Sequence, residues 1–237
     1  MNRWSSVILA AALVALPVSG LAQYQGGDVK DGGSISGTVK FKGTAPAPKK
    51  LDVGKDKEVC DKTPKYDQSL VVKGGNLVYA VVTITDIKKG KKLETKKVTL
   101  DQKGCEYHPH VLAFPAGTTV EILNPDGILH NVHSYSKVNS PFNMAQPKFK
   151  KSLEVKIEKP EAVEVKCDVH AWMHGWLVAT PNPYVAVTDD SGSFKLTDVP
   201  PGTYTVEVWH EKLGKSTQKV TVKAKEDAKV SFELAAK

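Results

Sequence analysis

The chain has 237 residues, 41% of them hydrophobic, with 33 lysine and arginine against 26 aspartate and glutamate residues and a net charge of +7. Its lysines are spread over residues 30–97 and 148–237 without an aromatic or arginine-rich pattern, which argues against nucleic-acid binding. Such lysines protect strand faces and edges from sheet-to-sheet aggregation, and the alternative is that they steer an acidic partner protein.

Residues 1–22 have the pattern of a secretory signal peptide. Arg3 lies in a short basic start, and residues 7–18 are apolar. Gly20 and Ala22 form a small-x-small ending, followed by a predicted cleavage before Gln23. The apolar run is too short to span a bilayer comfortably, and no cysteine follows the cleavage site as a lipid attachment point. We therefore expect export to the periplasm or the medium without a membrane anchor.

Short β-strands are predicted along the rest of the chain, because β-branched and aromatic residues alternate with small or polar ones between Gly- and Pro-rich turns. No segment before residue 98 has the pattern of an amphipathic helix. Residues 88–92 indicate a basic loop and 138–150 a long irregular connection. The expected strands of this all-β chain are 34–41, 69–72, 77–85, 111–114, 118–123, 129–135, 153–157, 162–167, 176–179, the end of 186–196, 199–209, 216–222 and 228–234.

Residues 167–173 carry the most distinctive chemistry of the sequence. Cys167, His170 and Met173 place a thiolate, an imidazole and a thioether at three-residue steps, which are donors of an electron-transfer copper site. Such a site needs a second imidazole, and His130 and His133 are the candidates upstream. They lie three residues apart on a predicted strand and project to opposite faces, so only one of them can bind the same ion.

Each of these residues also has a structural interpretation. Cys167 could be a buried thiol, His170 a surface or hydrogen-bonded histidine, and Met173 a filler of the core. Their regular spacing at the end of a strand favours ligation.

The three cysteines form an odd number, so one of them needs a separate role in an exported protein. With Cys167 taken as a metal ligand, Cys60 and Cys105 are left as a disulfide pair. The pair would close a loop of about 45 residues and add several kcal/mol of stability.

Residues 188–208 resemble part of a carboxypeptidase regulatory-like, or transthyretin-like, β-sandwich: an acidic turn, then Pro-Pro-Gly-Thr-Tyr and an alternating strand. The opening Gly-x-Val strand and valine-rich strand of such a domain match residues 37–39 and 78–85, far upstream. The resemblance implies an antiparallel sandwich built from residues 33–97 and 183–237, interrupted by an inserted domain at 98–182.

The insert resembles a cupredoxin, a Greek-key β-sandwich, in the order of residues 109–111, 116–124, 129–133 and the Cys167 loop. The two-residue gaps between Cys, His and Met are of the amicyanin type. The resemblance implies one type 1 copper ion with His130, Cys167, His170 and Met173 as ligands, and it selects His130 over His133. Asn131 beside it is expected to brace the ligand loop by hydrogen bonding.

The resemblance also implies that the ring edge of His170 lies at the protein surface as the electron port. Ala171, Trp172, Trp176 and Pro141 are expected around it. Ala171 departs from the proline that amicyanins usually carry at this position.

The other histidines of the insert, His108, His110 and His133, can be structural residues or ligands of a second metal ion. His133 is expected to bridge its ring to the backbone. His108 and His110 share a predicted face and could form a second metal site, with His133 as a further candidate. Packing or hydrogen bonding beside Cys105 is the preferred interpretation of His108 and His110.

Motifs of other redox proteins are missing from the sequence. The ligand loop has no second cysteine for a binuclear copper centre, Asp168 stands where multicopper oxidases carry a histidine, and no Cys-x-x-Cys-His haem motif occurs. We therefore expect an electron carrier that is not an enzyme. It would work between two redox proteins, a donor and an acceptor, and one of them would have an acidic docking face. The transthyretin-like sandwich would serve as a scaffold or docking platform.

Two other functions stay open. A copper-binding or delivery protein would exchange the ion without redox cycling, but the sequence has only three methionines. A structural or adhesive protein with a vestigial metal loop would not be expected to keep a complete ligand set.

Overall fold

The computed structural model describes residues 24–236, and the expected signal peptide at 1–22 lies outside the described residues. Within that range the chain forms twenty strands and one short helix, α1 (Lys57–Cys60), which confirms the all-β prediction. No helix in this part of the chain is long and apolar enough to cross a membrane.

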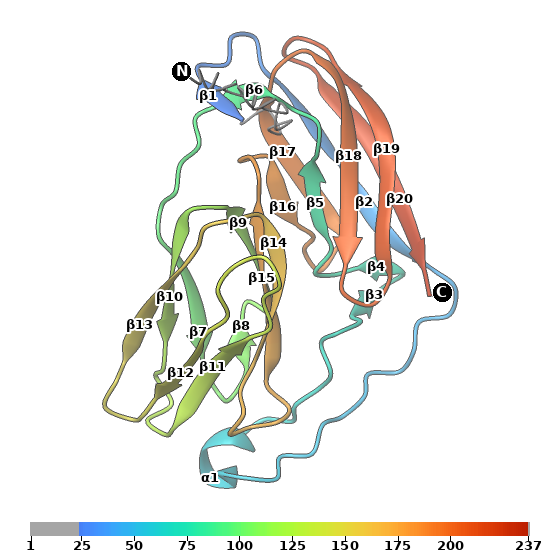
Figure 1. The fold of residues 1–237 in the computed structure, drawn as a ribbon. Helices are drawn as coiled ribbons and strands as arrows, with labels where there is room; N and C mark the ends of the chain where they lie inside the picture. The colour runs from blue at the N-terminus through green and yellow to red at the C-terminus, as the bar shows by residue number, and fades with distance from the viewer. Residues whose placement is uncertain (1–23, 237) are drawn as a thin grey trace, which may run out of the picture.

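The first sandwich consists of two sheets that share one apolar core (Figure 1). Its strands come from both ends of the chain, and β20 (Asp227–Ala235) runs parallel to β2 (Gly33–Lys42) over nine residue pairs. Alternation explains the core, since Val230, Phe232 and Leu234 of β20 point inward between exposed neighbours. The sheet orders are β16 (Val185–Val187), β5 (Val81–Ile84), β18 (Gly202–His210), β19 (Gly214–Val222), and β17 (Ser193–Val199), β2 (Gly33–Lys42), β4 (Asn76–Leu77), β3 (Val72–Lys73), with β20 (Asp227–Ala235) beside β2.

The second sandwich has its own core, which includes Leu100, Ile122, Val163 and Leu177. All its strands lie within residues 98–180, although the predicted domain boundaries themselves stay a prediction. The sheet orders are β13 (Ser152–Ile157), β10 (Thr118–Leu123), β7 (Val98–Gln102), β8 (Tyr107–His108), and β12 (Asn143–Gln146), β11 (His130–Ser134), β14 (Glu161–Lys166), β15 (His174–Thr180), β9 (Val111–Pro115).

Several short elements differ from the sequence prediction. The expected basic loop at 88–92 contains β6 (Lys89–Lys91), which pairs with β1 (Gln25–Gly27), and the expected irregular stretch at 138–150 contains β12. Helix α1 lies in a region where no helix was expected. Elements of two to four residues are too short to show a hydrophobic period. Pairing with another strand forms β6 and β12, and local hydrogen bonds form α1.

The two sandwiches meet at a small apolar junction. Val81 of the first and Val111 and Val178 of the second are buried there, and the rings of Trp176 and Trp209 pack edge to face with centroids 5.1 Å apart. Burial of these side chains favours a fixed contact between the sandwiches.

Residues 43–71, which we call the strap, cross between the sandwiches. The strap leaves the end of β2, reaches the far end of the second sandwich at α1, and returns to β3 (Figure 1). Cys60 at the end of α1 is joined to Cys105 of the second sandwich by a disulfide, which confirms the predicted pairing. The crosslink fixes the strap against the end of the sandwich where the candidate ligands lie.

Removing this crosslink is expected to destabilise the protein. A Cys60→Ala/Cys105→Ala double variant should lose about 4 kcal/mol of unfolding free energy, because the disulfide closes a loop of 45 residues and restricts the unfolded chain. Chemical denaturation checks this value, with reduced wild type as the matched control. A variant that unfolds at the same denaturant concentration as oxidised wild type would contradict it.

Candidate metal centre

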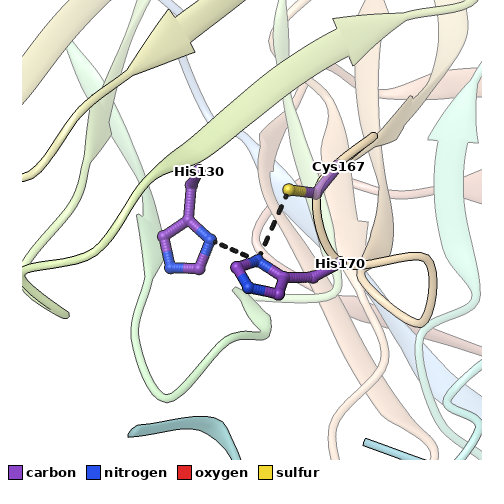
Figure 2. A group of neighbouring side chains, drawn as sticks. All are labelled: His130, Cys167 and His170. Carbon is purple, nitrogen blue, oxygen red and sulfur yellow. Dashed lines mark hydrogen bonds between the residues drawn. The ribbon is translucent and has the colours of Figure 1, made fainter. Parts of the chain in front are cut away.

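His130, Cys167 and His170 converge at one end of the second sandwich (Figure 2). His130 begins β11, Cys167 directly follows β14, and His170 lies in the loop between β14 and β15. His130 Nδ1 lies 3.0 Å from His170 Nδ1, and Cys167 Sγ lies 3.8 Å from the same nitrogen. Their donor atoms lie within 4.8 Å of one another, and each residue is at most 2% exposed. The structure thus brings together three of the four predicted ligands.

The fourth predicted ligand, Met173, is buried in the same core cluster as Cys167. The loop folds back on itself there: the Cys167 N–H donates to the Met173 carbonyl at 3.2 Å, and the Met173 N–H donates to the His170 carbonyl at 2.9 Å. These bonds hold the ligand loop closed, and ligation by the Met173 thioether stays a prediction.

Both ligand rings face a carboxylate on their outer side. His130 Nε2 lies 3.0 Å from Asp126 Oδ2, and His170 Nε2 lies 2.9 Å from Asp56 Oδ2. The carboxylates accept a proton from each Nε2, so a metal ion that displaced the Nδ1 protons would meet two Nδ1 lone pairs beside Cys167. Two imidazole nitrogens and one sulfur therefore point into a buried space with the donor chemistry that copper takes.

Asn131 braces the ligand loop, as expected. Its Oδ1 accepts the Asp168 N–H at 2.7 Å and lies 3.4 Å from the Cys167 sulfur. Its Nδ2 donates to Asp168 Oδ2 at 3.0 Å and to Asn143 Oδ1 at 2.7 Å. One buried amide thus ties β11 to the end of β14.

The surroundings of Cys167 favour its charged form. Burial raises the pKa of the thiol, but hydrogen bonds from His130 and His170 outweigh burial and hold the pKa at about 6. Burial also raises the pKa of Asp126, and its bonds to His130 and to the Gly104 and Cys105 N–H groups bring it below the usual value. The thiolate is the form of cysteine that binds metal, so a low pKa prepares Cys167 for this role.

The expectation of a surface-exposed His170 is wrong. The residue is 0% exposed, because Asp56 of the strap covers its Nε2. Trp172 packs against the ring with centroids 5.1 Å apart, as expected, but Trp176 lies in the junction between the sandwiches. A segment of the first sandwich thus occupies the position predicted for an open electron port.

His133 points away from the candidate centre, in agreement with strand alternation. Its side chain is 33% exposed, its ring stacks on Tyr135, and its Nδ1 lies 3.1 Å from Asp168 Oδ1. The expected bridge from the ring to the backbone is therefore wrong, since the partner is a side-chain carboxylate.

His108, His110 and His133 do not come together as a second metal site. His108 is exposed beside the Lys103 carbonyl at 3.2 Å, whereas His110 is buried against Glu211. Hydrogen bonding of His108 and His110, the preferred interpretation, is what the structure shows. Sequence reasoning missed Asp56, Asp126 and Glu211, because no local pattern distinguishes them from other loop carboxylates.

Comparison with known proteins gives partial matches. The model of the carboxypeptidase regulatory-like domain matches residues 177–235, the part that contains β16 to β20. No curated protein matches the chain. Among solved structures, a Cu-containing nitrite reductase from Thermus scotoductus SA-01 is 26% identical over 38% of this chain and 24% of its own, with a TM-score of 0.34. The chain therefore spans about a quarter of that protein's length.

Two smaller proteins also match. A mutant of amicyanin in the Cu(I) state is 20% identical over 35% of this chain and 82% of its own, with a TM-score of 0.32. A purple cupredoxin from Nitrosopumilus maritimus is 22% identical over 35% of this chain and 99% of its own, with a TM-score of 0.31. These likenesses cover only part of the chain, at low TM-scores.

The carboxylate behind His170 is expected to strengthen metal binding. Asp56→Asn should weaken copper binding about 10-fold, because a neutral partner orients and polarises the ring less well. A competition titration against a chelator of known affinity measures this loss. Asp52→Asn, an exposed position on the same strap, is the matched control. Equal affinity of the two variants would contradict the role of Asp56.

Proposed function

We propose that the protein holds one type 1 copper ion at His130, Cys167, His170 and Met173 and carries single electrons between redox proteins. The observation that supports this most is the convergence of two imidazole Nδ1 atoms and the Cys167 sulfur in one buried space. A bound copper ion supplies the one-electron couple between Cu(II) and Cu(I).

The contribution of the chain is to hold the ligands still. Asp126 and Asp56 fix the two rings, and Asn131 fixes the loop that carries Cys167. Ligands held by such partners move little when the charge of the centre changes, which lowers the reorganisation that electron transfer requires. The same burial keeps water and substrates away, so the proposal is a carrier without catalysis.

The proposal includes an exported location and protein partners. The pattern of residues 1–22 supports export to the periplasm or the medium. The net charge of +7 supports an acidic face on one redox partner, because opposite charge speeds association. A delivery protein would need an ion that exchanges readily, and a centre covered by the strap is unfavourable for that role.

The visible spectrum tests the copper site. Purified protein with one equivalent of Cu(II) should show an intense thiolate-to-copper band at roughly 600 nm. Cys167→Ser and His130→Gln should abolish the band, because each removes a ligand. His133→Gln, a histidine on the same strand that points away, should retain it and serves as the control.

Redox cycling then separates the carrier from a delivery protein. Voltammetry of the copper-loaded protein should show a reversible one-electron wave without loss of the ion. A colourless product would refute the copper site, and copper that passes to a weak chelator on reduction would favour delivery.

A further inference from the structure

A second group of metal-binding side chains lies between the sandwiches, apart from the proposed copper centre. His110 directly precedes β9, His174 begins β15, and Glu211 directly follows β18. His110 Nε2 lies 2.5 Å from Glu211 Oε1, and His174 Nε2 lies 3.7 Å from Glu211 Oε2. One donor atom from each residue lies within 4.8 Å of the other two.

Burial makes this arrangement chemically unusual. The side chains of His110 and Glu211 are 1% and 6% exposed, and that of His174 is 23% exposed. A buried carboxylate is costly unless a positive charge or several donors compensate it. The carboxylate has one oxygen toward each ring, Oε1 toward His110 and Oε2 toward His174.

We propose that His110, His174 and Glu211 bind a divalent ion of the Zn²⁺ type and clip the two sandwiches together. Two imidazoles and one carboxylate are a three-ligand set that zinc takes in proteins with water in the fourth position. The set has no sulfur donor, which separates it from the thiolate centre and favours Zn²⁺ over Cu(I).

Space for the fourth ligand adjoins the two histidines. A cavity of about 10 Å³ is lined by His110 and His174 together with Gln68 and Glu106. This is about the space that one water molecule needs, and the polar lining offers it partners. Glu211 does not line this cavity, so a water there would lie on the side of the two imidazoles.

The position of the site gives the ion a structural role. His110 and His174 belong to the second sandwich, whereas Glu211 lies at the turn between β18 and β19 of the first. The backbone at His110 is fixed beside β15, the strand that His174 begins, since the Trp176 N–H donates to the His110 carbonyl at 2.8 Å. An ion bound to all three residues would bind the folded contact only and so stabilise it.

Zinc titration in a Cys167→Ser background tests the inference without the thiolate centre. Calorimetry should show one Zn²⁺ per chain, and zinc should raise the thermal unfolding midpoint. Glu211→Gln in that background should weaken binding roughly 100-fold, since loss of a ligand exceeds the 10–100-fold cost of losing an outer partner. His133→Gln is the control and should leave zinc binding unchanged.

His174→Gln, at the most exposed of the three positions, should lose zinc binding in the same way and covers the case in which Glu211→Gln fails to fold. Absence of zinc binding in the Cys167→Ser protein would overturn the proposal. Binding that survives both Glu211→Gln and His174→Gln would also overturn it. The result is independent of the blue band, so failure of the copper proposal and failure of this one are distinguishable.

Discussion

The Cys60–Cys105 disulfide is the constraint on which the candidate copper centre depends. On one side of it, Asp56 immediately precedes α1, which ends at Cys60, and the Cys60 N–H donates to the Asp56 carbonyl at 2.9 Å. On the other side, the Cys105 N–H donates to the Asp126 carboxylate at 2.7 Å. Asp56 and Asp126, the two residues whose carboxylates face the candidate ligand rings, are therefore each hydrogen-bonded to a cysteine of the crosslink. The disulfide thus helps to position the groups that orient both rings.

The strap also reduces the exposure of the candidate copper centre to solvent. His170 is closed off by a segment whose ends lie in the first sandwich, between β2 and β3. In the proposed carrier, an electron that left by the outer edge of this ring would pass the Asp56 carboxylate and the strap before it reached solvent. The first sandwich is thus a part of the centre, because it supplies one of the groups that hold a ligand. A free-standing second sandwich would present a different, more hydrated ring.

Local patterns predicted the parts of the structure that depend on local geometry. Alternation along β11 separated His130 from His133, and the spacing of Cys167 and His170 anticipated their meeting in one loop. Most longer strands followed from the same alternation. Asp56 and Glu211 could not be predicted in this way. They reach histidines 114 and 101 residues distant in the chain, and such a contact depends on how two sandwiches are joined.

The candidate copper centre and the proposed zinc site share one structural feature but differ in their donor atoms. In each, a carboxylate from a distant segment, Asp56 or Glu211, lies within hydrogen-bond distance of an imidazole of the second sandwich. The first group also contains a cysteine sulfur, which suits a soft, redox-active ion. The second has only imidazole and carboxylate donors, which suit a borderline ion without redox chemistry. Met173 and His174 are adjacent in sequence, so movement at the junction between the sandwiches is transmitted by one peptide bond to the ligand loop. A fixed junction would therefore support a fixed geometry at the proposed copper centre, which is the property that rapid electron transfer requires.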